Sequence, residues 1–552
     1  MRVPELNRDR TTVAVLAIAL LGLAVRLLSL GWRVFHWDEA RVGYWILRYG
    51  ETGVWSYRPI VHGPFLFHVN EVVFDVLGPT DFAARLVVAV VGAVLPAGAL
   101  LFRYRLDPVE TITLATFLAF NPVLVYYSRF MRNDVLAAAF AFAAVGAFVR
   151  LADTGRQRYL YGGTAALALA ATTKEIVVVY VAVWVGALFL LLDHRLVTAR
   201  FRDEDWVVVI GDYARTALDR VRTWALPIYL AVLEFLLVIV VFYAPRPDLY
   251  QALGDPGRLL PVVESATVGT WRALWGTWIA GGHEHSYVAF LLADVRRIGA
   301  TSATIVVFAA LGFAVNRYGR GDTRDLVTFG SVWAVAMFLA YPAITDISAP
   351  WGLVHPIVPL AIPAAVGAGY AIRIGHRAVR DRDRLRSVLV TAILLVGALN
   401  VGVVVCDTSF DSPQASDNPL VQYGQPASHL QQTLADVARI AAANEGTDVL
   451  FYGEHFYVTN ESAPLEGPNW TNRFPLPWYL ERAHAVTNST KRPAGLADPP
   501  PVVIARAKHY STVNERLEGY DALAYELTAP NTETIFFVEQ SALRDPSSKK
   551  SP

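Results

Sequence analysis

Long apolar stretches alternate with short polar, arginine-bearing segments along the first 406 residues. A bilayer core takes about 20 apolar residues in a helix, and eleven runs reach or approach that length. We therefore predict about eleven membrane-spanning helices, of which the run at 160–173 is the shortest. The runs lie at 11–31, 83–102, 109–127, 134–149, 160–173, 175–192, 224–244, 299–315, 325–342, 352–372 and 387–406.

The arginines orient these helices, because cytoplasmic loops are rich in Arg and Lys. With the N-terminus inside, the six cytoplasmic segments carry 23 arginines, most densely at 373–386. Arg26 interrupts the first run, so that run is a helix and not a cleaved signal peptide. Eleven crossings then place residues 407–552 outside the cell membrane. The three Asn-x-Ser/Thr sequons agree, since all lie in this tail: Asn460, Asn469 and Asn488.

The tail differs in character from the rest of the chain. It carries 18 acidic and 11 basic residues, and short apolar runs at 448–452, 502–505 and 534–538 predict strands, with a helix at 429–443. The predicted fold is therefore mainly α. It is a polytopic membrane bundle over 1–406, with a first outer loop at 32–82, followed by an extracytoplasmic α/β domain over 407–552.

Composition excludes several classes of protein. Hydrophobic residues make up 54% of the chain and charged residues 17%, which is too apolar for a soluble or disordered protein. The net charge of zero argues against nucleic acid as a partner. The single cysteine, Cys406, excludes a disulfide framework and a cysteine-based zinc site. The sequence also lacks the GxxxxGK[ST], GxSxG and HExxH motifs, so ATP-driven transport, serine hydrolysis and zincin chemistry lose support.

Ionisable side chains collect at the predicted outer ends of the helices, where charges near membrane depth need a reason. Each has a simpler explanation: a solvated loop for an acidic pair, snorkelling for an arginine, a hydrogen-bonded structural role for a histidine. The run at 283–285 (His-Glu-His) lacks the spacing of a zinc site and is interpreted as a solvated loop. The set comprises Asp38, Glu39, His62, Arg129, Arg132, Asp134, Lys174, Glu175, Asp346, Trp351 and His355.

Lys174 stands out because it is the only lysine among the first 490 residues, in a stretch dominated by arginine. It either pairs with Glu175 or a neighbouring carboxylate, or it provides a point charge for a phosphate oxygen. Carboxylates supply a general base or metal ligands, and cations stabilise a leaving phosphate. This combination suits group transfer from a lipid-phosphate donor.

These residues also carry a resemblance to a known family. An acidic pair at Asp38–Glu39 is followed by His62-Gly63-Pro64 and by GPTDFAARL at 78–86. The sequence thereby resembles the GT-C membrane glycosyltransferases, which include protein O-mannosyltransferases and lipid A aminoarabinose transferases. Their later signature matches Asn121-Pro122, Tyr127-Ser128-Arg129 and Arg132-Asn133-Asp134.

The sequence is most similar to an archaeal branch, the flippase activity-associated proteins of N-glycosylation. This similarity rests on Thr-Lys-Glu at 173–175 and FPLPWYLE at 474–481. Two departures affect how the acceptor is handled. His62-Gly63-Pro64 replaces the commoner residue-Pro-Pro, and the stretch 346–351 lacks the basic residue often seen before Pro-Trp.

The resemblance implies roles for these residues. Asp38 is expected to be the catalytic base or a metal ligand, with Glu39 as its companion. Arg132 and Lys174 are expected to hold the lipid phosphate. A divalent cation, Mg²⁺ or Mn²⁺, and a metal-free site both stay open. The other predicted substrate-binding residues are His62, Arg129, Asp134, Glu175, Trp351 and His355.

The leading hypothesis is an integral-membrane glycosyltransferase. It would move a sugar, with inversion, from a polyprenyl- or dolichyl-phosphate donor to a lipid-linked glycan or protein acceptor at the outer face. The first alternative is a flippase, or a flippase-associated protein, for lipid-linked saccharides. A scaffold whose tail recruits partners is the second. Membrane lipids are expected partners in every case, and the aromatic run at 474–481 is predicted to be core and not a lid.

Overall fold

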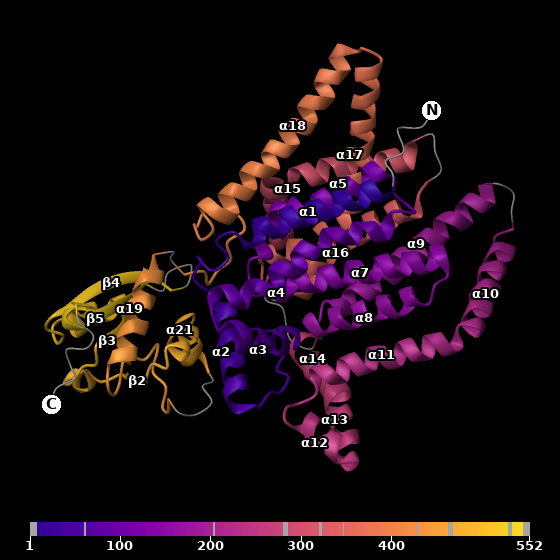
Figure 1. Ribbon diagram of the computed structural model, residues 1–552. Coiled ribbons are helices and arrows are strands. Elements are labelled where there is room, and N and C mark those ends of the chain that lie inside the picture. The colour runs from indigo at the N-terminus through magenta and orange to yellow at the C-terminus, as the bar shows by residue number, and fades with distance from the viewer. Residues whose placement is uncertain are drawn as a thin grey trace. The chain divides into compact units, whose positions relative to one another are not determined.

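The computed structural model describes residues 8–59, 62–201, 205–279, 285–319, 323–345, 347–426, 429–461, 467–527 and 533–544. The chain divides into two compact units (Figure 1). The first comprises Met1–Leu28, Trp55–His68 and Arg85–Asp411, and the second comprises Ser29–Val54, Val69–Ala84 and Ser412–Pro552. Two stretches of the predicted first outer loop thus belong to the same unit as the tail.

The first unit is helical. Its helices are α1 (Arg8–Leu27), α5 (Pro108–Phe120), α6 (Pro122–Tyr127), α7 (Asn133–Thr154), α8 (Arg158–Thr173), α9 (Val177–Phe201), α10 (Trp206–Thr223), α11 (Ala225–Tyr243), α12 (Asp248–Gly254), α13 (Leu259–Glu264), α14 (Thr270–Leu274), α15 (Tyr287–Tyr318), α16 (Asp325–Ile344), α17 (Val354–Arg380) and α18 (Arg384–Cys406). Most of α4 (Asp81–Val94) and the start of α3 (Phe65–Leu77) also belong to it. Short 3-10 or π turns are η1 (Leu95–Phe102), η2 (Pro256–Arg258), η3 (Ser265–Gly269), η4 (Trp275–Ile279), η5 (Pro350–Leu353) and η6 (Asp407–Asp411).

Nine helices within the described residues are long and apolar enough to cross a membrane, and they coincide with nine of the eleven predicted runs. The predicted helical membrane bundle is therefore confirmed, with a smaller number of full-length helices. The run at 109–127 breaks at Pro122 into α5 and α6, because proline lacks an N–H and disfavours helical geometry in the preceding residue. The run at 160–173 forms α8, which has 16 residues.

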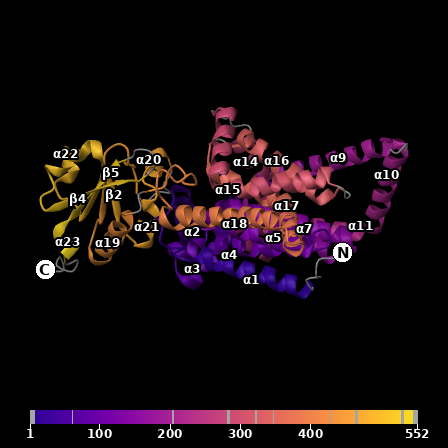
Figure 2. The same ribbon diagram turned by 90° about the horizontal axis from the view of Figure 1, so that it is seen from above.

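Helices α15 and α17 make the closest contact in the bundle, and they lie side by side in Figures 1 and 2. A Cβ atom on Gly312 would lie 1.8 Å from the Pro363 carbonyl oxygen, and one on Gly367 would lie 2.0 Å from the Phe308 carbonyl oxygen. Membrane helices use small residues in this way to bring their backbones together. This contact fixes α17, which carries His355 near its start.

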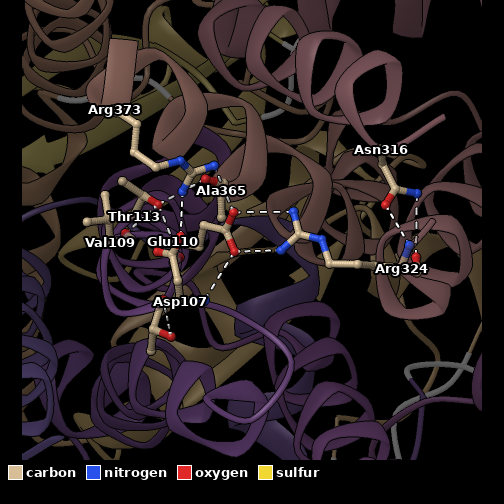
Figure 3. A network of polar contacts seen from close by, with 9 residues as sticks. Asp107, Val109, Glu110, Thr113, Asn316, Arg324, Ala365 and Arg373 are labelled. Carbon is tan, nitrogen blue, oxygen red and sulfur yellow. Dashed lines mark hydrogen bonds and ion pairs between the residues drawn. The ribbon is translucent and has the colours of Figure 1, made fainter. Parts of the chain in front are cut away.

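A network of charges joins the ends of α5, α16 and α17 (Figure 3). The buried Glu110 accepts hydrogen bonds from both guanidinium NH groups of Arg324, at 2.7 and 3.2 Å, and from Arg373 at 3.2 Å. Arg373 also donates to Asp107 at 2.5 Å, and Asn316 on α15 holds the backbone of Arg324. The arginine pattern predicts these segments on one side of the membrane, and their side chains do meet at one end of the bundle.

The second unit contains a five-stranded sheet. Its strands are β1 (Val449–Tyr452), β2 (Thr487–Thr490), β3 (Val502–Arg506), β4 (Tyr520–Glu526) and β5 (Glu533–Glu539), in the order β2-β1-β3-β5-β4. Strands β1, β2 and β3 are parallel, whereas β5 pairs antiparallel with β3 and β4. The helices and turns of this unit are α2 (Trp37–Thr52), most of α3, α19 (Leu430–Ala443), α20 (Pro468–Thr471), α21 (Leu476–Arg482), α22 (Tyr510–Asn514), α23 (Gln540–Arg544), η7 (Pro493–Leu496) and η8 (Ala507–His509).

The sequence located the buried part of this sheet. β1, β3, β5 and α19 coincide with the four predicted elements, whereas β2 and β4 were missed. Both missed strands lie at the edges, where most of their side chains are partly or fully exposed and no apolar run marks them.

The run at 474–481 is core, as predicted. Phe474, Leu476 and Trp478 are buried, and the Trp478 ring stacks on Phe35 with a centroid distance of 4.8 Å. A Cβ atom on Gly43 of α2 would lie 2.6 Å from Trp478, so α2 and α21 pack closely. This packing fixes the start of α2, which carries Asp38.

Candidate functional site

A buried cluster of charged side chains lies at the start of α7. Asp134 occupies the first turn of this helix, where the helix dipole favours a carboxylate. Its Oδ1 atom lies 2.5 Å from Lys174 Nζ, and its Oδ2 atom lies 3.3 Å from Arg132 Nε. All three side chains are buried. The structure thereby brings together residues that are 40 positions apart in the sequence.

His355 completes the cluster from α17. Its Nε2 atom lies 3.2 Å from Asp134 Oδ1, and its Nδ1 atom lies 2.6 Å from the Tyr180 hydroxyl. Because a carboxylate only accepts, Nε2 carries the proton, and Nδ1 of the neutral ring accepts from Tyr180. The Tyr341 ring stacks on the imidazole, and its hydroxyl lies 3.4 Å from Lys174 Nζ. The imidazole is thus held in one orientation.

The cluster pairs two cations with a shared carboxylate. Lys174 and Arg132 both contact Asp134, and the Arg132 guanidinium lies 4.0 Å from the centre of the Trp351 ring. Burial lowers the pKa of Lys174, but the Asp134 carboxylate raises it by a larger amount. The pKa of Lys174 therefore lies above its ordinary value. Lys174 therefore stays charged. An ammonium and a guanidinium group held together in this way are the groups that bind phosphate oxygens in proteins.

A second polar group adjoins Lys174. His62 Nδ1 lies 3.2 Å from Glu175 Oε2, and the Tyr57 hydroxyl donates to Glu175 Oε1 at 2.8 Å. Burial raises the pKa of Glu175, but the hydrogen bonds from His62 and Tyr57 lower it by a larger amount. The pKa of Glu175 therefore lies below its ordinary value. Glu175 therefore stays ionised and orients the imidazole of His62.

The backbone at His62 has an uncommon conformation, with φ of 77°, which side-chain-bearing residues rarely adopt. The next residue, Gly63, donates its N–H to the Thr173 carbonyl oxygen at 2.9 Å. A Cβ atom on Gly63 would lie 2.2 Å from the Thr172 carbonyl oxygen. This close approach explains why His62-Gly63-Pro64 departs from the residue-Pro-Pro pattern. Strained backbone of this kind concentrates at functional sites.

Arg129, which the sequence predicts to bind substrate, contacts backbone carbonyl groups in the structure. Its NH1 atom donates to the carbonyl oxygens of Leu28, Val25 and Arg26 at 2.5, 3.2 and 3.3 Å. These carbonyls lie at and just beyond the C-terminal end of α1, where backbone acceptors need partners. Arg26 does the same for the end of α5, donating to the Ala119 carbonyl at 2.8 Å. The two arginines tie α1 to its neighbours.

Asp38 and Glu39 lie in the second unit, at the start of α2, and they differ in their surroundings. Glu39 is fully buried, accepts from the His36 backbone N–H at 3.0 Å and pairs with Arg33 at 3.0 Å. It therefore fixes the turn that begins α2. The Asp38 side chain keeps 24% of its surface exposed and lies 3.9 Å from His36 Nδ1. Of the two, Asp38 has the carboxylate that solvent or substrate can reach.

Two predictions from the sequence concern a possible metal ion and the His-Glu-His run at 283–285. Within the described ranges, no group of three or more His, Cys, Asp or Glu side chains could hold a metal ion. His285 Nε2 is hydrogen-bonded to the Pro342 carbonyl oxygen, and His283, Glu284 and Asp346 lie outside the described residues.

Three tyrosines in this site were not predicted from the sequence. Tyr57, Tyr180 and Tyr341 supply hydroxyl groups to Glu175 and to the Asp134 cluster. The chain contains 24 tyrosines, so only their position in the fold distinguishes these three.

Two family models match parts of the chain. Residues 61–210, which include the buried cluster's Asp134 and Lys174, match the model described as dolichyl-phosphate-mannose-protein mannosyltransferase. Residues 430–539 match the model described as the Agl23 flippase-associated protein C-terminal domain. No curated protein matches the chain.

Two solved structures share the fold. Both are ArnT from Cupriavidus metallidurans, one in the apo state and one bound to undecaprenyl phosphate. The apo structure has a TM-score of 0.56 at 16% sequence identity, and the bound structure has a TM-score of 0.57 at 15% identity. Each comparison covers 96% of this chain and 98% of the other.

The comparisons and the apolar helices define the protein as a multi-pass membrane protein with an ArnT-like fold. Within this fold, one segment is similar to dolichyl-phosphate-mannose-protein mannosyltransferases and the C-terminal domain is similar to that of the Agl23 flippase-associated protein.

Proposed function

We propose that the protein transfers a sugar from a polyprenyl-phosphate donor to a lipid-linked glycan or a protein acceptor. The observation that carries this proposal is the buried cluster with two cations and one carboxylate. Lys174 and Arg132 are assigned to the donor phosphate, and Trp351 positions Arg132 through its ring. The undecaprenyl phosphate in the similar ArnT structure supports a lipid of this class.

The reaction that fits these groups is a displacement at the anomeric carbon. The acceptor oxygen forms a bond to that carbon while the bond to the phosphate oxygen breaks, so the configuration inverts. The acceptor proton passes to Asp38, and the polyprenyl phosphate leaves with its negative charge. Lys174 and Arg132 stabilise that charge, which grows as the bond breaks. Each role is a proposal for a residue whose geometry is described above.

The flippase-associated alternative has one specific observation in its favour, the match of residues 430–539 to the Agl23 C-terminal domain. The same cations would then hold a lipid phosphate without chemistry. The two functions predict different products. A transferase forms a new glycosidic bond, whereas a flippase only moves its lipid to the other leaflet.

The test uses purified full-length protein in proteoliposomes. A polyprenyl-phosphate sugar labelled in the sugar is supplied with extracted membrane lipids as acceptors. Wild type is compared with Asp38→Asn and with Asp498→Asn, an exposed carboxylate in the same unit that serves as the control. We expect label on a new acceptor with wild type and the control, and a loss of at least about 100-fold with Asp38→Asn, as for removal of a general base.

Two outcomes contradict the proposal. Full transfer by Asp38→Asn removes the proposed base. Faster crossing of the donor without any labelled product supports the flippase. Repeating the assay with EDTA tests the metal: loss of transfer would show that a divalent cation is required, and full transfer would show a metal-free reaction.

The orientation, with the N-terminus in the cytoplasm and residues 407–552 outside the plasma membrane, is part of the proposal. It is supported by the arginine distribution. In a Cys406→Ser background, Asn488→Cys is expected to react with a membrane-impermeant maleimide on intact cells. Arg382→Cys, between α17 and α18, is expected to react only after lysis. The reverse pattern would overturn the orientation.

A further inference from the structure

Helix α10 (Trp206–Thr223) differs from every long helix around it, because none of its residues is buried. It is nevertheless a well-defined helix. The Asp205 side chain caps its start by accepting from the Val207 N–H at 2.9 Å, and the helix ends at Trp224, directly before α11. Arg195 on α9 donates to the Tyr213 hydroxyl at 2.6 Å and ties α10 to the bundle.

The residues of α10 divide into two faces. At 100° per residue, five of the seven Trp, Val, Ile and Leu side chains fall within an arc of about 120°, and four of the five charged side chains fall on the opposite side. Val208 lies among the charged side chains, and Val209 and Arg220 lie between the two faces. The apolar face comprises Trp206, Val207, Ile210, Leu218 and Val221, which are 37% to 55% exposed. The charged face comprises Asp212, Arg215, Asp219 and Arg222.

The neighbours of α10 fix its place in the bundle. It connects α9 (Val177–Phe201) to α11 (Ala225–Tyr243), and both are among the helices long and apolar enough to cross a membrane. Figures 1 and 2 show α10 running across the direction of α9 and α11, at the end of the bundle where α1 begins. A helix that links two membrane-spanning helices and runs across them lies where those helices leave the bilayer.

We propose that α10 is an interfacial helix whose apolar face inserts into the headgroup boundary of the membrane. The partner is the lipid surface itself. A face of large apolar side chains, opposite a charged face, is the pattern of helices that lie in the membrane plane. The ends of α10 are already held at the bilayer by α9 and α11, so the helix has little freedom left to lose when it inserts.

The charges of α10 nearly cancel, so they contribute little to its attraction to the membrane. Arg215 pairs with Asp212 at 3.3 Å, and the helix carries three arginines and two aspartates. The attraction therefore comes mainly from the apolar face, and only weakly from charge. Binding in this mode is expected to be insensitive to salt.

The consequence concerns the position of α9. This helix begins next to Lys174, and its residues Tyr180 and Trp184 lie beside His355 and Trp333. An anchored α10 fixes the depth of the opposite end of α9 in the bilayer. The lipid surface thereby sets the height of the helix that carries part of the candidate site.

The test measures the depth of nitroxide labels in full-length protein reconstituted in phosphatidylcholine–phosphatidylglycerol nanodiscs. All variants carry Cys406→Ser, which removes the only native cysteine. Labels are placed at Ile210→Cys and Val221→Cys on the apolar face. The matched controls are Arg215→Cys and Asp219→Cys on the charged face. Power saturation compares the accessibility of each label to oxygen and to a water-soluble nickel chelate.

The expected result is a several-fold higher ratio of oxygen to nickel accessibility at Ile210 and Val221 than at the two controls. High nickel accessibility on both faces overturns the proposal, because the helix then lies in water. Low accessibility to both reagents at Ile210 also overturns it, since the face is then covered by protein, such as a second copy. A second copy is identified by nanodiscs that hold a single protein molecule, in which the label at Ile210 becomes accessible again.

Discussion

Replacing Asp134 with asparagine tests the buried cluster most directly. The substitution keeps the shape and hydrogen-bonding capacity of the side chain but removes the only carboxylate described beside Lys174 and Arg132. Removing one partner of a buried ion pair costs about 3–5 kcal/mol, because the remaining charge is left uncompensated. We therefore expect Asp134→Asn to lower the free energy of unfolding by about that amount.

The assay is thermal unfolding in detergent micelles, followed by tryptophan fluorescence. The matched control is Asp325→Asn, which removes an aspartate from an exposed pair with Arg195 and is expected to cost about 0–1 kcal/mol. The double variant Asp134→Asn/Lys174→Met removes opposite charges and is expected to recover part of the loss. Equal melting temperatures for Asp134→Asn and the control would refute the reasoning.

The same variant tests whether the cluster binds an anion. A ligand present at 100 times its dissociation constant stabilises the folded state by about 2.7 kcal/mol, and a polyprenyl phosphate is expected to stabilise wild type in this way. Asp134→Asn increases the positive charge of the cluster, so the same lipid is expected to raise its melting temperature by more. A polyprenyl alcohol, which lacks the phosphate, is the control. A shift of the same size with the alcohol would show that the phosphate makes no contribution.

Three further predictions follow from the fold. Gly312→Ala is expected to destabilise the bundle by about 3 kcal/mol, because its Cβ atom would lie 1.8 Å from the Pro363 carbonyl oxygen. The control Gly299→Ala has open space around its Cβ atom and is expected to be neutral or stabilising in the same melting assay. Glu110→Gln leaves two partly exposed arginines without their shared carboxylate and is expected to cost about 1–3 kcal/mol; no change would mean that solvent screens the network. Glu175 has a pKa below its ordinary value, so its contribution to stability is complete above about pH 4.3 and is lost as the pH falls through the lower, folded-state pKa. The difference in melting temperature between wild type and Glu175→Gln is therefore expected to shrink between pH 7 and pH 3, and a constant difference would contradict this.

The sequence located the long helices because hydropathy is a local property. Nine predicted runs correspond to helices long enough to span a bilayer. The break between α5 and α6 was not predicted, although Pro122 is also a local signal, because it lies within an apolar run. In the tail, β1, β3 and β5 were found for the same reason. The polar edge strand β2 (Thr487–Thr490) left no pattern to read.

The structure brings together several of the residues that the sequence analysis selected. Lys174 was singled out by its rarity, and it does lie in a buried polar cluster with Asp134 and His355. Arg129 was grouped with them because it lies at the same predicted outer turn and in the Tyr127-Ser128-Arg129 match to the family signature, but in the structure its described partners differ from those of Arg132. Its guanidinium contacts backbone carbonyls at the end of α1.

The amino-acid sequence by itself determined the membrane class, the helical bundle and the residue types of the site. Long apolar runs, a scarcity of charged residues and a lone lysine among the first 490 residues can be recognised within short segments of sequence. The free energy of placing such a segment in a membrane depends mainly on the segment itself. The tertiary structure decided which charges meet. Asp134 and His355 are 221 residues apart, and Glu39 became a buried structural partner while its neighbour Asp38 kept an accessible carboxylate. Such pairings depend on how helices pack, because hydrogen bonds and ion pairs form only when side chains from distant segments reach the same place.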